Sequence, residues 1–378
     1  MSNVKTAYVI SCSDHYDHRL HVLADYLRSK GYTVTYITSD FDHTSKQHFR
    51  CSVPGCVQLP AKPYRKNLSL DRILSHRMFA RDVFRYLDKL EQQPDVVAAL
   101  IPPNFLAHYG AKYKKKHPGV YLIYDIFDMW PETFPFGRAK KLLAPVFGIW
   151  AWIRDHNLSA ADYVTTECEM FRKLLKLPED KSKAIPLCAD ALTIPACEIQ
   201  LREDRLELCY LGAINNVIDI PAICALVREL TTERPVTVHI IGKGEREQEL
   251  IDGLENAGAE VIFYGPVYDE RKKQEIISRC HFGLNIMKAS VCVGLTMKSV
   301  DYFRFGLPII NNIPSDTRIL VEEQGIGIQM GENCARQMLT RSNRDCFAMR
   351  ERVRQVFGDR FDKKVVMEQY RQLFDAAL

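Results

Sequence analysis

The chain alternates between short apolar runs, typical of buried strands, and longer amphipathic runs, typical of helices. It opens with a strand pattern at Thr6–Ile10, a helix pattern from about His18 to Lys30 and a second strand pattern at Thr33–Ile37. Further strands are predicted at Val96–Ile101, Val120–Ile126 and Asp162–Thr166, and helices near residues 68–92, 104–116, 139–157 and 168–176. This alternation predicts an open, doubly wound parallel α/β sheet with right-handed crossovers.

The same alternation restarts after an irregular stretch. Prolines and the charged run Arg202–Arg205 predict a linker over residues 187–204. Beyond it, strands are predicted at Leu206–Leu211, Val236–Ile241, Val261–Phe263, Phe282–Ile286 and Pro308–Asn311, and helices at Ile220–Leu230, Glu245–Ala257 and from about Lys298. We therefore expect two Rossmann-like domains, over residues 1–186 and 205–358, and a terminal helix over 359–378 that packs back on the first domain. A chain of 378 residues suits two cores.

Composition narrows the functional class. With 47% hydrophobic and 26% charged residues, the chain resembles a soluble globular protein. It shows neither a signal-peptide pattern nor a membrane-spanning run, so we expect a cytoplasmic protein. The twelve cysteines form no Cys-x-x-Cys pair, which predicts reduced thiols and no metal site. The net charge of +4 is modest and no recognition motif is present, so no nucleic-acid partner is expected.

The most informative run is GLTMKSVDYFRFGLPII, residues 294–310. A glycine loop leads into a helix that carries Lys298 and, three residues later, Asp301. Loop amides and the positive end of a helix suit a diphosphate, and Lys298 adds to that charge. A carboxylate such as Asp301 can accept hydrogen bonds from the vicinal hydroxyls of a ribose. The alternative is an exposed Lys–Asp pair on an ordinary helix.

This run resembles the donor-nucleotide motif of the two-domain GT-B glycosyltransferases, particularly glycosyltransferase family 4. Bacterial polysaccharide and O-antigen members commonly read G-L-P-x-K-x-x-E-Y and, further on, G-x-P-V-I. The residues at the corresponding positions here are Gly294, Leu295, Thr296, Lys298, Asp301, Gly306 and Pro308. The resemblance implies that Asp301 binds the ribose. Thr296 replaces the usual proline, and Val293 stands where many members carry a glutamate that contacts the donor sugar.

Three further stretches extend the resemblance through the second half. Gly212, in YLGAINN, matches the loop that opens the donor domain, although Ala213 replaces the family's arginine. Lys243, in HIIGKGERE, follows the next strand and is a second candidate cation for the diphosphate. Val267, in VIFYGPVYDE, matches the segment whose backbone meets the base.

In the first half, YDIFDMWPETFP resembles the strand-end Asp-x-Trp-Pro motif of the same family. Asp128 is our candidate for orienting the acceptor hydroxyl or accepting its proton. The alternative is that Asp128 only caps the following turn. His15 and His18, in DHYDHRL, are candidates on the acceptor side, and the alternative for them is an ordinary surface position.

These patterns together predict a glycosyltransferase with its active site in the cleft between the domains. The donor is a UDP- or GDP-linked sugar, used as substrate with no further cofactor. The acceptor is a sugar or a lipid-linked or protein-linked glycan. The resemblance implies a retaining, metal-independent reaction. A sugar-nucleotide epimerase of the same fold and a non-catalytic partner subunit are the alternatives.

Two segments predict contact with the inner face of a membrane. Lys112–Lys116 is a basic cluster, and Leu142–Ile153 is rich in bulky apolar residues. The alternative is a core helix beside a solvated basic face.

Overall fold

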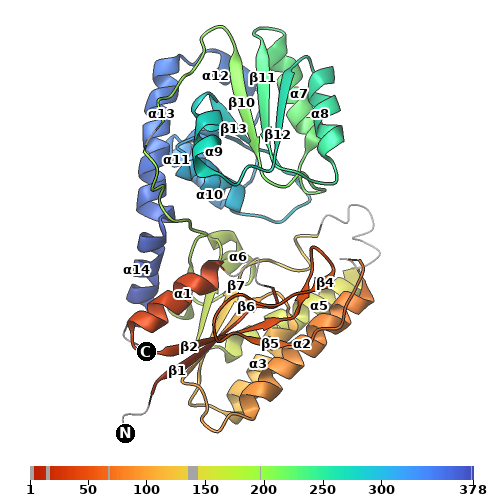
Figure 1. The fold of residues 1–378 in the computed structure, drawn as a ribbon, viewed down its shortest axis with the longest axis vertical. Coiled ribbons are helices and arrows are strands. Elements are labelled where there is room, and N and C mark those ends of the chain that lie inside the picture. Colours follow the sequence, from red (N-terminus) through yellow and green to blue (C-terminus); the bar gives the residue numbers. More distant parts are fainter. Residues whose placement is uncertain (1–3, 14–17, 67–68, 135–143, 196, 376) are drawn as a thin grey trace. The chain divides into compact units, whose positions relative to one another are not determined.

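The computed structural model describes residues 4–13, 18–66, 69–134, 144–195, 197–375 and 377–378, with no side chain described for His18 (Figure 1). The chain divides into two compact units. Unit 1 comprises residues 1–186 and 366–378, and unit 2 comprises residues 187–365. The predicted linker, 187–204, therefore falls within unit 2, and the terminal helix from Val366 onward falls within unit 1.

Unit 1 is built on a parallel sheet that is 7-stranded within the described residues. In sheet order its strands are β5 (Val57–Leu59), β2 (Thr33–Ser39), β1 (Thr6–Ile10), β6 (Val96–Ile101), β7 (Tyr121–Ile126), β8 (Tyr163–Thr166) and β9 (Ser182–Ala184). Its helices are α1 (His18–Ser29), α2 (Leu70–Asp88), α3 (Phe105–Lys116), α5 (Ala144–Asp155) and α6 (Glu169–Leu174). A small antiparallel pair, β3 (Phe41–Asp42) and β4 (Gln47–His48), follows β2.

Local sequence explains these elements. Every residue of β6, VVAALI, is buried, as expected for a central strand of a parallel sheet with helices on both faces. The side chain of Ser69 accepts a hydrogen bond from the Arg72 amide and so caps α2. The helices α2, α3 and α5 pack successively against one another.

A buried ion pair ties α1 to this sheet. Arg19 of α1 is 3% exposed and Asp125 of β7 is 1% exposed, and the guanidinium donates two hydrogen bonds to the carboxylate, from Nε at 2.9 Å and from Nη2 at 2.7 Å. Thr165 of β8 donates a further bond to Asp125. Arg19 also donates to the carbonyl oxygens of Ile185 and Thr166. The pair therefore links α1 to three strand ends.

Unit 2 repeats the architecture with a 6-stranded parallel sheet. In sheet order its strands are β12 (Glu260–Gly265), β11 (Val236–Ile241), β10 (Leu206–Leu211), β13 (Phe282–Asn285), β14 (Ile309–Asn311) and β15 (Gly327–Gln329). Its helices are α7 (Ile220–Thr231), α8 (Glu247–Asn256), α9 (Glu270–Ser278), α10 (Met297–Arg304), α11 (Asp316–Gln324), α12 (Cys334–Leu339) and α13 (Asn343–Val356). The helices α7 and α8 pack together, as do α10 and α13.

The last helix, α14 (Lys363–Phe374), ends against unit 1 residues. The ring of Phe374 contacts those of Tyr26, Tyr121 and Tyr163, with centroids 5.4–6.2 Å apart. Lys30 forms an ion pair with Asp375 at 2.8 Å.

The predicted α/β architecture of two doubly wound parallel sheets is confirmed. The strands Thr6–Ile10, Val96–Ile101, Leu206–Leu211 and Val236–Ile241 have the predicted bounds. The short edge strands β5, β9 and β15 and the helices α9, α11, α12 and α13 were not predicted. The described part of the predicted helix at 139–157 begins at Ala144 as α5. No described helix combines the length and the apolar character that a membrane span requires.

Candidate functional site

Counted along the chain within each sheet, the strand order is 3-2-1-4-5-6-7 in unit 1 and 3-2-1-4-5-6 in unit 2. The first strand, β1 or β10, lies between the second and the fourth, so successive connections leave it in opposite directions. In such sheets ligands bind at the carboxyl ends of the strands beside this switch point. We call these two places the carboxyl edge of unit 1 and the carboxyl edge of unit 2.

The carboxyl edge of unit 2 is formed largely by backbone. Gly212, directly after β10, has φ +114°, and its amide donates to the Ile241 carbonyl at 2.9 Å. Gly242, directly after β11, comes so close that a Cβ there would lie 1.9 Å from the Gly212 oxygen. A glycine is therefore needed at position 242 for the contact between the loop after β10 and the loop after β11.

The helix α10 begins at this edge. Thr296 caps it, because the Thr296 hydroxyl accepts a hydrogen bond from the Ser299 amide at 3.0 Å. The preceding loop is held by Thr317, whose hydroxyl donates to the Gly294 carbonyl at 2.6 Å. Leu295, which lies between Gly294 and Thr296 in the sequence, is buried, at 3% exposure. The first amides of a fixed helix end form an anion-binding position.

Lys298 lies in the first turn of α10 and points to the Gly212 loop. Its Nζ donates to the Tyr210 hydroxyl at 3.1 Å and lies 4.2 Å from the centre of that ring. A Cβ on Gly212 would be 3.5 Å from Lys298 Cε. Burial lowers the pKa of Lys298 to about 7, because an enclosed ammonium loses its hydration.

The other predicted donor residues occupy different positions around this edge. Asp301 is half-buried, three residues beyond Lys298 on α10. Val267 is half-buried and follows β12. Lys243 is exposed in the turn after β11. The structure thus brings Gly212 and Lys298 into contact, while Lys243 extends into solvent.

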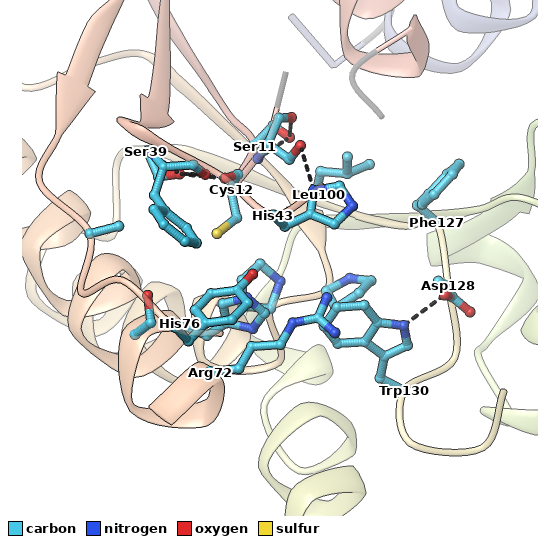
Figure 2. Close-up of a pocket in the computed structure, with 17 residues that line it drawn as sticks. Ser11, Cys12, Ser39, His43, Arg72, His76, Leu100, Phe127, Asp128 and Trp130 are labelled. Atoms are coloured by element: carbon cyan, nitrogen blue, oxygen red, sulfur yellow. Dashed lines mark hydrogen bonds between the residues drawn. The ribbon is translucent and has the colours of Figure 1, made fainter. Parts of the chain in front are cut away.

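The carboxyl edge of unit 1 contains a cavity of about 140 Å³ (Figure 2). Its walls follow the ends of β1, β2, β6 and β7 and the first turns of α2. The residues with polar side chains or aromatic rings around it are Ser11, Cys12, Ser13, Ser39, Phe41, His43, Tyr64, Arg72, Ser75, His76, Phe127, Asp128 and Trp130.

Asp128 lines this cavity at the end of β7. Its Oδ1 accepts from the Met129 amide at 2.8 Å and its Oδ2 accepts from Trp130 Nε1 at 2.7 Å (Figure 2). Burial raises the pKa of Asp128, and these hydrogen bonds oppose the rise. The carboxylate therefore does cap the turn, as the alternative reading required, and it also faces the cavity.

The turn after Asp128 is fixed from two helices. Arg154 of α5 is fully buried and donates to the Trp130 carbonyl at 2.8 Å and to the Glu132 carboxylate at 2.9 Å. Asn104, immediately before α3, also donates to the Trp130 carbonyl at 2.9 Å. These contacts hold the Asp128–Trp130 segment in position.

The two predicted histidines give less information. His15 lies outside the described residues, and His18 is the first residue of α1, with no described side chain. Their neighbour Arg19, which we did not single out from the sequence, forms the buried pair with Asp125.

The cavity also uses residues that sequence reasoning missed. Arg72, Ser75 and His76 are all buried on α2. Their spacing continues the stripe of Phe79 and Val83, which faces the core. The sequence signal for this site was three polar residues, Arg72, Ser75 and His76, at the start of the buried stripe of a helix, because core-facing positions of a helix are normally apolar.

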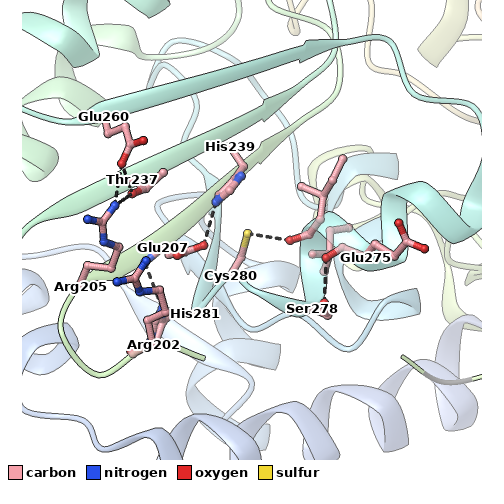
Figure 3. Close-up of polar contacts among 12 residues, drawn as sticks. Arg202, Arg205, Glu207, Thr237, His239, Glu260, Glu275, Ser278, Cys280 and His281 are labelled. Carbon is pink, nitrogen blue, oxygen red and sulfur yellow. Dashed lines mark hydrogen bonds and ion pairs between the residues drawn. The ribbon is translucent and has the colours of Figure 1, made fainter. Parts of the chain in front are cut away.

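A second cavity, of about 360 Å³, lies at the opposite, amino edge of the sheet in unit 2. Figure 3 shows two contacts in its wall, Arg205 with Glu260 and Glu207 with His239. Arg205 pairs with Glu260 at 2.6 Å and Arg202 with Asp204 at 2.7 Å. These charges already have partners, and the amino edge is not where ligands bind in this topology.

Carboxylates elsewhere are engaged in turns. Asp40 accepts from the Ala61 amide and pairs with His48, and Asp42 accepts from the Thr44 amide. Among the described residues, no group of three or more His, Cys, Asp or Glu is placed to hold a metal ion. All twelve cysteines are described, and all are free thiols.

Comparison with known proteins now adds family and fold. Residues 18–191 match the family model of Glycosyltransferase Family 4. None of the curated proteins matches the sequence. The structure of the lipopolysaccharide outer core galactosyltransferase WaaB is similar over 99% of this chain and 100% of its own, with 13% identity and a TM-score of 0.66.

Two further solved structures were determined with nucleotide sugars. Anabaena HepE in complex with UDP-glucose covers 98% of this chain and 99% of its own, with 12% identity and a TM-score of 0.63. A structure named trehalose-6-phosphate from E. coli, bound with UDP-2-fluoro glucose, covers 97% of this chain and 98% of its own, with 10% identity and a TM-score of 0.66. These likenesses confirm the GT-B fold, and the family match confirms the predicted resemblance over the first half. The expected enzyme class, a glycosyltransferase, is that of the matched family.

Proposed function

We propose that this GT-B glycosyltransferase, whose residues 18–191 match family 4, moves a hexose-type sugar from a UDP- or GDP-linked donor to a hydroxyl group of a glycan acceptor. The main support is the position of Lys298. Its ammonium lies beside the Gly212 loop and in the first turn of α10, so a cation, loop amides and a helix end converge. This is the combination that binds a diphosphate.

In this proposal unit 2 binds the donor. The diphosphate lies against Lys298, Gly212 and the loop Gly294–Thr296, and Asp301 accepts hydrogen bonds from the ribose hydroxyls. The backbone near Val267 contacts the base. Lys243, exposed in the neighbouring turn, adds long-range attraction for the phosphates. The UDP and UDP-sugars bound to the similar solved structures support a donor of this class.

Unit 1 presents the acceptor. Asp128 faces the cavity, and its raised pKa suits a group that accepts the proton of an attacking hydroxyl. His15 and His18 follow β1 in the chain, and we propose them as acceptor-side residues on the family resemblance alone. That resemblance also supports retention of anomeric configuration and a role in surface polysaccharide or glycoconjugate synthesis.

Nucleotide-induced stabilisation tests the donor site. UDP or GDP is expected to stabilise the parent by about 2.7 kcal/mol at a hundredfold excess over Kd, and to stabilise Asp301→Ala scarcely at all. The matched control is Glu255→Ala, at the far end of α8. Equal shifts for Asp301→Ala and the parent would remove Asp301 from the site. Turnover of donor without acceptor would instead indicate an epimerase, and absence of any nucleotide effect a partner subunit.

We also propose that a lipid-linked acceptor is reached at the inner face of a membrane. Val146, Ile149 and Trp152 lie at spacings of three along α5 and are 51%, 64% and 56% exposed. The neighbouring helix α3 carries the exposed Lys112 and Lys115. An apolar face beside basic residues fits an anionic lipid surface. Leu142 and Leu143, also part of the predicted segment, lie outside the described residues.

Vesicle binding tests this contact. The parent is expected to sediment with phosphatidylglycerol vesicles and not with phosphatidylcholine vesicles. Ile149→Ser is expected to weaken binding about tenfold, since it removes most of one apolar side chain that would be buried in the lipid surface. Ile319→Ser, which removes an apolar side chain of 46% exposure from unit 2, is the control. Equal binding by both variants would show that α5 is not the membrane face.

A further inference from the structure

The cavity of unit 1 contains a charge in an otherwise largely uncharged wall. Arg72 of α2 is only 9% exposed, and its guanidinium lies 4.3 Å from the centre of the Trp130 ring and 5.8 Å from that of Tyr64. Figure 2 shows Arg72 extending along the cavity toward Trp130. Stacking against rings uses the faces of a guanidinium, whereas hydrogen bonds to carboxylates and phosphates use its edge. A stacked arginine is therefore oriented for an oxyanion.

A second polar group in the wall lacks a partner. His76, one turn after Arg72, is 5% exposed and stacks on Trp130 with the ring planes 14° apart. Its Nδ1 atom has no hydrogen-bond partner among the described residues. Burial, Arg72 and His43 together lower the pKa of His76 well below its usual value, so the ring is neutral and has one N–H to donate. A buried polar atom without a partner is costly, and a ligand in the cavity would satisfy it.

The surroundings make the cavity favourable for negative charge. Lys46 Nζ lies 4.8 Å from the centre of the Tyr64 ring, which Arg72 also faces, so two cations lie on this side. Burial and the charge of Arg72 lower the pKa of Lys46. The titratable groups that line the cavity with Arg72 include Cys12, His43, Tyr64 and His76. Burial keeps the Cys12 thiol protonated, because it raises the pKa of that thiol to about 12. On the opposite wall, both oxygens of Asp128 accept hydrogen bonds within its own turn. The Arg72 side of the cavity thus has hydrogen-bond donors and positive charge.

We infer that the acceptor carries an oxyanion group, a carboxylate or a phosphate on a sugar ring, which binds in this cavity against the guanidinium of Arg72 and the Nδ1–H of His76. Only the identification of the ligand as the acceptor rests on the proposed function. The cavity, the stacked arginine and the unpartnered histidine nitrogen stand independently of it. The hydroxyls of Ser11, Ser39 and Ser75 line the same space and suit the remaining oxygens of the ring.

Calorimetric titration with matched sugars tests the inference. Glucuronate carries a carboxylate and glucose 6-phosphate carries a phosphate, each on a glucose-type ring. Glucose is the uncharged comparison. Saturating UDP is present throughout, so that phosphate cannot enter a nucleotide site in unit 2. At least one charged sugar is expected to bind the parent at least tenfold more tightly than glucose does. The sugar that binds identifies which oxyanion the cavity prefers.

Two variants on one helix locate the binding. Arg72→Met is expected to reduce the affinity for the charged sugar at least tenfold, while Arg77→Met, an exposed arginine on α2, keeps it. If Arg72→Met fails to fold, Arg72→Lys takes its place, since it keeps the charge, loses the planar fork and should bind several-fold more weakly. Equal binding of charged and neutral sugars, undiminished binding by the Arg72 variants or no binding of either charged sugar would overturn the inference.

The two proposals fail separately in this design. Repeating the titrations without UDP shows whether charged sugars bind in an Arg72-dependent manner even when no nucleotide binds. Such binding, in a protein that neither UDP nor GDP stabilises, would keep the anion site and remove the donor site. Nucleotide stabilisation without binding of a charged sugar would do the reverse.

Discussion

The two carboxyl edges occupy the same place in the same topology but are made differently. In unit 2 the edge is formed largely by backbone. The loops at Gly212 and Gly242 are in contact, and the Gly294 carbonyl accepts a hydrogen bond from the Thr317 hydroxyl. The cationic side chain of Lys298 extends to Gly212. In unit 1 the edge is side chain, with rings and Arg72 around a cavity. Strand order sets where a ligand binds, and the residues at the edge set which ligand.

The difference fits the two halves of the proposed transfer reaction, donor binding in unit 2 and acceptor binding in unit 1. A diphosphate is common to UDP- and GDP-linked sugars, and backbone amides recognise it without specifying the rest of the donor. An acceptor varies between enzymes, and side chains can vary with it. Predictions that affect one edge and leave the other intact therefore test the comparison directly.

The largest effect is expected at Asp128. Asp128→Asn should lower kcat by about 10²–10⁴-fold, because an amide cannot accept the acceptor proton. UDP-induced stabilisation should be unchanged, since the proposed donor site lies in unit 2. The readout is release of nucleoside diphosphate in the presence of acceptor, beside a melting curve with UDP.

The alternative role for Asp128 predicts another result. If the carboxylate only caps its turn, the variant should lose about 1 kcal/mol or more of stability through the Trp130 hydrogen bond and keep its kcat. That outcome would leave the edge of unit 1 as a binding surface without a base.

The next effect concerns the support of the unit 1 edge. Arg19→Met should lower the free energy of unfolding by about 3–5 kcal/mol, because Asp125 would remain buried without its cation. The control, Lys62→Met, breaks an exposed pair with Asp71 and should cost at most about 1 kcal/mol. Urea unfolding with hydrogen exchange of β7 measures both. Equal losses would show that the buried pair does not support the sheet.

Three elements show which parts of the fold could be predicted from the sequence and which could not. The strand β6 was predictable because all six residues of VVAALI are apolar and buried, and β10 because its apolar run is interrupted only by Glu207. The helix α13 was missed because its buried face includes Arg350, whose charge is satisfied by the carbonyls of Ile277 and Cys280. Those carbonyls come from another segment, so no local pattern records them.

The same reason separates the two sites. The residues proposed to bind the donor between Gly294 and Asp301 lie in one continuous segment, and one motif contains them. The cavity of unit 1 joins Ser11, Arg72 and Trp130 from three distant segments. Sequence placed Asp128 at the end of its strand, but only the folded chain brings Arg72 beside Trp130.

Adding a methyl group at Gly242 tests whether the carboxyl edge of unit 2 depends on close contact between backbone segments. Gly242→Ala should destabilise unit 2 by about 1–3 kcal/mol, since its Cβ would overlap the Gly212 carbonyl. It should also weaken UDP binding by displacing the Gly212 loop. Gly331→Ala, with nothing within 4 Å of the added Cβ, is the control in the same unit. An unchanged melting temperature and UDP affinity would show that the close approach of the loops is dispensable.

The smallest effect expected is a pH dependence that belongs to unit 2 alone. The pKa of Lys298 is lowered to about 7, so its ammonium is charged below that pH and is lost above it. UDP-glucose, whose diphosphate does not titrate in this range, should bind about tenfold more weakly at pH 8.5 than at pH 6.5. Stability without ligand should move the other way. Between pH 7 and the usual lysine pKa the unfolded chain holds the proton that the folded chain has released, so stability rises with pH. Lys298→Met should remove both dependences, and Lys243→Met should remove neither. If the Lys298 variant keeps the parent's profile, another group titrates at this edge and the diphosphate does not depend on Lys298.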